Sequence, residues 1–225
     1  DLKPAGVFKY FEEICQVPRP SKKEEKMIAY LKAFGAKHNL ETKVDEAGNV
    51  LIKKTATPGK ENLQTVVLQS HIDMVCEKNN DVQHDFLTDP IETEIDGEWL
   101  KAKGTTLGAD NGIGVALALS VLQDKTLRHG PLEALITYDE ETGMTGANSL
   151  KAGILKGDIL LNLDSEEEGE LCTGCAGGVD GAADFAYRTY KTPEGFVGYK
   201  ITVKGLKGGH SGMDISLFRG NANKI

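Results

Sequence analysis

Three apolar segments of this chain each end at side chains that commonly bind divalent metals. The segments and the side chains that follow them are 65–68 with His71 and Asp73, 132–138 with Glu140 and Glu141, and 158–163 with Asp164. A short apolar segment bounded by turn-forming or polar residues is typical of a buried strand. Because ligands of open α/β sheets bind beyond the carboxyl ends of the strands, the sequence predicts that these side chains meet at one sheet edge.

A fourth candidate, Asp110, lies in the glycine-rich segment 104–114. Four glycines in this segment predict a tight backbone pressed against another part of the protein. One imidazole and several carboxylates would form a nitrogen- and oxygen-rich pocket suited to a catalytic divalent metal. This pattern indicates a hydrolase.

Helical and strand patterns alternate before residue 165. The expected helices are 4–14, a helix that follows Ser21, and 113–122; the expected hairpins are 41–54 and 91–102. Ser21 and Glu24 match a capping box, which predicts that both side chains close the start of the second helix. The alternation predicts an α/β sheet covered on both faces.

The pattern changes after Gly177 and Gly178. Residues 182–189 and 198–203 alternate as strands of a separate antiparallel unit would. Two or three strands are marginally stable alone, so this second unit looks unfinished.

The composition excludes several functions. Hydrophobic residues make up 40% of the 225 and charged residues 27%, which is ordinary for a globular protein. A net charge of −8 argues against nucleic-acid binding. Neither an apolar stretch near the ~20 residues that span a bilayer nor a signal-peptide core is present, so we expect a cytoplasmic protein that does not enter the membrane. The four scattered cysteines are expected to be reduced.

His71 and Asp73 are two residues apart, so in a strand their side chains point the same way. Asp73 can then accept the second N–H of the imidazole, as carboxylates do for metal-bound histidines. The alternative is a histidine at a strand end that bonds to an acid for stability.

The acidic candidates also have structural alternatives. Asp110 precedes an expected helix and could be its N-cap. Glu140 and Glu141 diverge on extended backbone, so that one could bind metal while the other acts as general base, or both could lie in a solvated loop. Asp164 ends an apolar strand and needs a partner, which a metal or a capping interaction would provide.

Cys172 and Cys175 form a single C-x-x-C pair. A structural zinc site needs a second pair, and the neighbouring glycines favour a turn over the helix of a redox motif. A thiol redox protein with a reactive Cys172 remains an alternative. His210 lies between glycine pairs, where it could be an ordinary solvated loop residue.

Four motifs, in order along the chain, resemble those of the aminoacyl-histidine dipeptidases (Xaa-His dipeptidases, peptidase D), a branch of the dinuclear zinc exopeptidases. They read QSHIDMV at 69–75, GTTLGADNG at 104–112, TYDEETG at 137–143 and LNLDS at 161–165. The resemblance covers nearly the whole chain and implies a mixed sheet flanked by helices. Residues 1–177 would be the amino-terminal part of the catalytic domain, and 178–225 the beginning of a smaller α+β lid domain through which homodimers form.

The resemblance implies two zinc ions, with cobalt or manganese as alternatives. Asp110 would bridge the two ions, His71 and Asp164 would be the other ligands of one, and Glu141 would bind the second. The bond between Asp110 and Asn111 is expected to be cis.

The same resemblance implies that Glu140 is the general base and that Asp73 orients His71. His210 would be the lid histidine that supports the oxyanion.

The implied function is zinc-dependent hydrolysis of dipeptides, preferentially those of the Xaa-His type. Family members are longer, and the remaining ligand of the second zinc, a histidine beyond the lid, has no match here. We therefore expect this chain to be the amino-terminal part of such an enzyme. The alternatives are a catalytically incompetent metal-binding or oligomerisation fragment, and an acylase or desuccinylase of the same superfamily.

Overall fold

The structure is a computed structural model that describes residues 2–165, 169–174, 177, 181–209 and 214–225. Its contacts divide the chain into two compact units, Asp1–Thr173 and Gly174–Ile225.

The first unit is built on a mixed five-stranded sheet with the strand order β1-β2-β6-β3-β7. Its strands are β1 (Glu41–Val44), β2 (Val50–Lys54), β3 (Val66–His71), β6 (Leu132–Thr137) and β7 (Ile159–Asn162). β1, β2 and β6 pair antiparallel, whereas β6, β3 and β7 run parallel. The predicted mixed sheet is confirmed, and the carboxyl ends of its three parallel strands lie at one edge.

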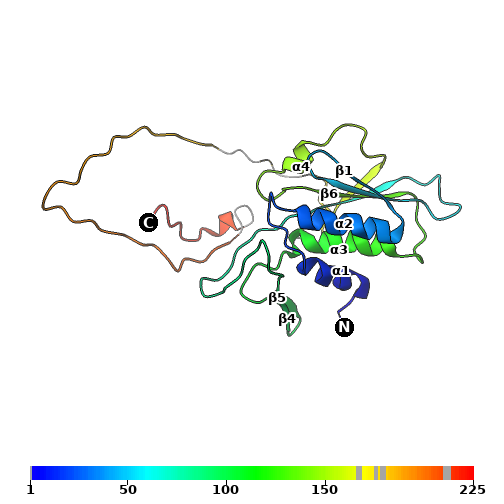
Figure 1. Cartoon of the computed structure of the whole chain (residues 1–225), viewed down its shortest axis with the longest axis horizontal. Helices are drawn as coiled ribbons and strands as arrows, with labels where there is room; N and C mark the ends of the chain where they lie inside the picture. Colours follow the sequence, from blue (N-terminus) through cyan, green and yellow to red (C-terminus); the bar gives the residue numbers. More distant parts are fainter. Residues whose placement is uncertain (1, 166–168, 175–176, 178–180, 210–213) are drawn as a thin grey trace. The chain divides into compact units, whose positions relative to one another are not determined.

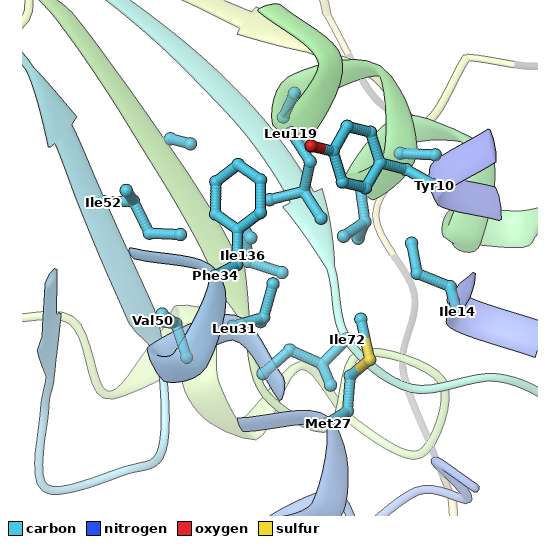
Figure 2. Packing of buried hydrophobic residues seen from close by; sticks show 14 of the residues in the cluster. Tyr10, Ile14, Met27, Leu31, Phe34, Val50, Ile52, Ile72, Leu119 and Ile136 are labelled. Atoms are coloured by element: carbon cyan, nitrogen blue, oxygen red, sulfur yellow. The ribbon is translucent and has the colours of Figure 1, made fainter. Parts of the chain in front are cut away.

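Three helices lie on one side of this sheet (Figure 1): α2 (Glu25–His38) and α3 (Ala109–Gln123) pack against its strands, and α1 (Ala5–Cys15) packs against α3. Their apolar sides meet alternate strand residues such as Val50, Ile52 and Ile136 in the main core, which Figure 2 shows around Leu31 and Leu119. One-sided packing explains why the sequence showed the helical periodicity of α1 and α2, whereas α3 is apolar on most sides because it lies between the sheet and α1.

The opposite face carries a smaller cluster of Leu51, Val67 and Leu135. These strand residues pack against Leu150 and Ile154, which follow the short helix α4 (Thr145–Asn148). The predicted hairpins are present as β1–β2 and as a separate pair, β4 (Thr93–Asp96) with β5 (Trp99–Ala102).

Two details of the helix starts differ from expectation. The capping box is wrong: α2 begins at Glu25, and neither Ser21 nor Glu24 caps it with its side chain. Instead, Ser21 donates to Asp73 and Glu24 accepts the Asp139 N–H, because long-range partners compete for these groups.

The helix α3 starts four residues earlier than expected. Its first turn includes Asp110 and Asn111, which have non-helical backbone angles and are joined by a cis peptide bond. The cis geometry that the resemblance implied is therefore present.

In the second unit, the two strands expected at 182–189 and 198–203 are absent, although the structure describes both segments. Its only helical turn among the described residues is η1 (Ile215–Leu217). Strand pairing needs neighbours with which to share backbone hydrogen bonds, and alternation in a sequence does not supply them. Among the described residues, no helix is both long and apolar enough to cross a membrane.

Truncating a core side chain of α3 should test this packing. Leu119 is fully buried, so Leu119→Ala is expected to lower the free energy of unfolding by about 2–5 kcal/mol. Leu117→Ala, at a 37% exposed position of the same helix, should cost much less. Urea unfolding of both variants measures the difference, and equal losses would contradict the assignment of this face to the core.

Candidate metal centre

The predicted metal-binding side chains meet at the carboxyl edge of the parallel strands. His71 ends β3, while Glu140 and Glu141 follow β6 and Asp164 follows β7. Asp110 reaches the same place from the first turn of α3. The sheet topology therefore gathers residues that are up to 93 positions apart in the sequence.

The ligand atoms are close enough to share a cation. One atom each of His71, Asp110 and Glu141 lie within 4.8 Å of one another. The Asp164 carboxylate is 3.6 Å from the Nε2 atom of His71. An imidazole nitrogen with several carboxylate oxygens is a donor set that suits zinc and similar divalent ions, so the residues present fit a metal.

The His71 imidazole is held on both sides and is 1% exposed. Its Nε2 atom is 2.8 Å from Asp110 Oδ1 and its Nδ1 atom is 3.2 Å from Asp73 Oδ1. Burial disfavours the charged imidazole, but the hydrogen bonds to Asp110 and Asp73 outweigh it and raise the pKa of His71 to about 10. Without a metal, a proton therefore holds the imidazole among the acids.

Asp73 is a fully buried organising residue. Besides His71, it accepts the Ser21 hydroxyl at 2.7 Å and the backbone N–H groups of Glu140 and Glu141 at 3.0 and 3.2 Å. Burial would raise the pKa of Asp73, but the hydrogen bonds from His71, Glu140 and Ser21 lower it to about 2. A single carboxylate thus fixes both the imidazole ring and the backbone of the two glutamates.

The remaining acids repel one another. Burial, with the charge of Asp110 adding to it, raises the pKa of Glu141 to about 7. Burial likewise raises the pKa of Glu140 and of Asp164, whereas the hydrogen bond with His71 lowers the pKa of Asp110. A metal cation would relieve this repulsion, which is the electrostatic condition expected of a divalent site.

Two supporting residues were missed by the sequence analysis. The Asn111 amide donates to the Leu163 carbonyl and to Asp164, at 2.9 and 2.5 Å, and thereby ties the start of α3 to the end of β7. The other is Arg19, which the sequence indicated only through the glycine-rich segment 104–114 that packs against it.

Arg19 is buried and donates to three backbone carbonyls: those of Ile72 and Asp73 after β3, and that of Gly108 before α3. A Cβ atom at Gly108 or Gly112 would lie 2.5 or 2.6 Å from its guanidinium. The tight glycine backbone predicted for 104–114 is thus pressed against Arg19.

The structure leaves two of the other candidates undescribed. His210 and Cys175 lie outside the described residues, and Cys172 is an exposed, free thiol. A groove of about 700 Å³ runs between α1 and the β4–β5 pair, but none of the candidate metal ligands lines it.

Comparison with known proteins gives a consistent result. Residues 67–209 match the model of peptidase family M20/M25/M40. The chain is 52% identical over 224 residues to the cytosol non-specific dipeptidase of Escherichia coli, covering all of this chain and 46% of that protein.

Solved structures are similar as well. The crystal structure of aminoacylhistidine dipeptidase from Vibrio alginolyticus matches 99% of this chain and 46% of its own, with 53% identity and a TM-score of 0.78. The aminopeptidase PepT of Bacillus cereus matches 72% of this chain and 43% of its own, with 26% identity and a TM-score of 0.62. The chain spans about half the length of the curated relatives that it matches.

Proposed function

The chain belongs to peptidase family M20/M25/M40, and from this premise we propose that the protein hydrolyses dipeptides with a water molecule activated beside His71. The observation that carries the proposal is the gathering of His71, Asp110, Glu141 and Asp164, with Glu140 next to them in the chain. The names of the two most similar relatives described above point to dipeptide substrates, and one of them to the Xaa-His type.

The metal would be zinc, with cobalt or manganese as alternatives. His71 and Asp164 would hold one ion, Asp110 would bridge to a second, and Glu141 would bind that second ion. When bound, two such ions lower the pKa of a water molecule and polarise the scissile carbonyl group. The donor set described above supports this assignment, because its acids repel one another until a cation is present.

The protein's own residues would then move the proton and hold the geometry. Glu140 is the proposed general base, which takes a proton from water and delivers it to the leaving amine. Burial raises the pKa of its half-buried carboxyl group, which makes the carboxylate a stronger proton acceptor. Asp73 orients His71 and the glutamate backbone, and His210 is proposed to support the oxyanion.

The wider organisation follows the same proposal. Residues 1–177 would contribute the catalytic part and residues 178–225 the beginning of a lid through which a homodimer forms. A cytoplasmic location is proposed from the name of the Escherichia coli relative.

Metal dependence provides the first test. We expect the protein to bind zinc and to cleave an unblocked Xaa-His dipeptide, and we expect a chelator to reduce this activity to background until zinc is restored. Isothermal titration and an amine-release assay measure the two properties.

The alternative functions are distinguished by the same assay. Cleavage of N-acetylated amino acids in preference to dipeptides would indicate an acylase instead. Zinc binding without any turnover would indicate a non-catalytic metal-binding module. Activity that persists in chelator but is lost in Cys172→Ser would point to thiol chemistry.

A further inference from the structure

Behind the candidate metal centre lies a buried carboxyl group that the proposed chemistry does not use. Glu24, just before α2, is 0% exposed. Its Oε1 atom accepts the backbone N–H of Asp139 at 2.9 Å, while its Oε2 atom has no hydrogen-bond partner. A buried oxygen without a partner is costly, so this atom needs an explanation.

Glu24 belongs to a second cluster of acids. One oxygen each of Glu24, Asp73 and Asp139 lie within 4.8 Å of one another, and all three residues are buried. Three carboxylates at this separation cannot all be ionised without a compensating positive charge.

The charged and titratable neighbours do not supply that charge at Glu24. On the β3 side, His71 bonds to Asp73 and Asp110, and the hydrogen bonds of Arg19 go to backbone carbonyls. On the β6 side, the neighbour is Tyr138, whose neutral phenol forms a hydrogen bond with Glu24 but brings no positive charge; burial, the charge of Glu24 and this hydrogen bond raise the pKa of Tyr138 to about 12. Beside Glu24 in the chain, Lys23 and Glu25 are exposed.

The hydrogen bonds also indicate which neighbouring carboxylate could accept a proton donated by Glu24. The two oxygens of Asp73 already receive four donors, which fill the roughly four lone-pair positions of a carboxylate. Asp139 receives only the hydroxyl groups of Thr142 and Thr145 on its side chain. Asp139 therefore retains acceptor capacity for a further donor.

We propose that Glu24 is a positioning residue that holds the turn bearing Glu140 and Glu141 as a neutral carboxylic acid, accepting the Asp139 N–H at Oε1 and donating from Oε2 to the Asp139 carboxylate. Asp73 binds the next two N–H groups of the same turn. The turn is thus held from two sides, by Glu24 at Asp139 and by Asp73 at the two glutamates. This inference depends on the proposed function for its catalytic meaning, whereas the hydrogen bonding can be tested without metal.

The local electrostatics support a retained proton. Burial, together with the charge of Asp73, raises the pKa of Glu24 to about 7, although the backbone groups of Asp139, Glu24 and Lys22 act in the opposite direction. The folded protein then holds a proton that an unfolded glutamate releases near pH 4.5. The corresponding stability is complete below that value and is lost as the pH rises through about 7.

Two substitutions of Glu24 and one control substitution test whether Glu24 acts as a neutral hydrogen-bonding acid. Glu24→Gln keeps an acceptor and replaces the acid proton with an amide donor, Glu24→Ala removes both groups, and Glu25→Gln changes the exposed neighbour. Urea unfolding of the metal-free protein from pH 5 to 8, followed by zinc titration of each variant, supplies the two measurements.

We expect the folding equilibrium constant of the wild type, relative to that of Glu24→Gln, to fall by up to about tenfold per pH unit as the pH rises towards 7. Glu24→Ala should be less stable than Glu24→Gln and should bind zinc about 10-fold or more weakly, within the range for supporting residues of metal sites. Glu24→Gln should bind zinc within about twofold of the wild type, since its hydrogen bonds are kept. Glu25→Gln should follow the wild type throughout.

The proposal is overturned if Glu24→Gln is as unstable as Glu24→Ala, or if its stability has the same pH dependence as the wild type. The first result would mean that an ionised Glu24 or a bound cation is needed there. Unchanged zinc affinity in Glu24→Ala would overturn the positioning role. If the wild type binds no zinc, the proposed function fails, and the pH comparison still decides the state of Glu24.

Discussion

Glu140→Gln is expected to lower kcat for dipeptide hydrolysis by about 100- to 10,000-fold while zinc affinity stays near that of the wild type. Glutamine has the same shape but cannot take a proton from water. Its backbone N–H to Asp73 does not change, so the turn should keep its position. Steady-state kinetics with an Xaa-His dipeptide, together with zinc titration, measure both quantities.

The adjacent residue provides a matched control. Glu141→Gln makes the same chemical change one position away, in a side chain that lies within 4.8 Å of the His71 and Asp110 ligand atoms. It should weaken zinc binding, and activity should recover in part at high zinc concentration. If Glu140→Gln behaves in this way and Glu141→Gln loses only kcat, the two proposed roles are reversed.

The sequence predicted those site residues that lie next to an apolar strand segment. His71 ends one apolar strand, and Glu140 and Asp164 follow two others; parallel pairing of β3, β6 and β7 is enough to bring such strand ends to one edge. An apolar segment followed by a histidine or an acid, together with the rule that parallel strands end at one sheet edge, therefore predicted which side chains would meet.

The supporting residues could not be found in this way, because their partners are far away in the sequence. Arg19 bonds to Gly108, 89 residues away, and Glu24 to Asp139, 115 residues away. For Ser21 and Glu24 the local rule gave a wrong answer. Their spacing is that of a helix cap, but in the folded chain Ser21 donates to the Asp73 carboxylate and Glu24 accepts the Asp139 backbone N–H. Apolar alternation likewise failed at 182–203, where no neighbouring strand is described.

Asp110→Asn should have the largest effect on metal binding, and should weaken it by more than about 100-fold, the upper range for residues that only support ligands. Asp110 is the proposed bridging ligand, so one substitution removes a negative charge from both ion positions. Its side chain is 54% exposed, and an asparagine can retain a hydrogen bond to His71, so the fold should change little.

Competition for zinc against a chromogenic chelator measures the affinity, and urea unfolding in excess chelator measures the stability. The control is Asp164→Asn, at a residue proposed to bind only one ion, which should weaken binding less and leave one site occupied. Asp110→Asn with unchanged affinity would remove the bridging role. A bridging ligand affects the occupancy of both sites, so Asp110→Asn should lose more affinity than Asp164→Asn. Equal losses in the two variants would mean that both acids bind the same single ion.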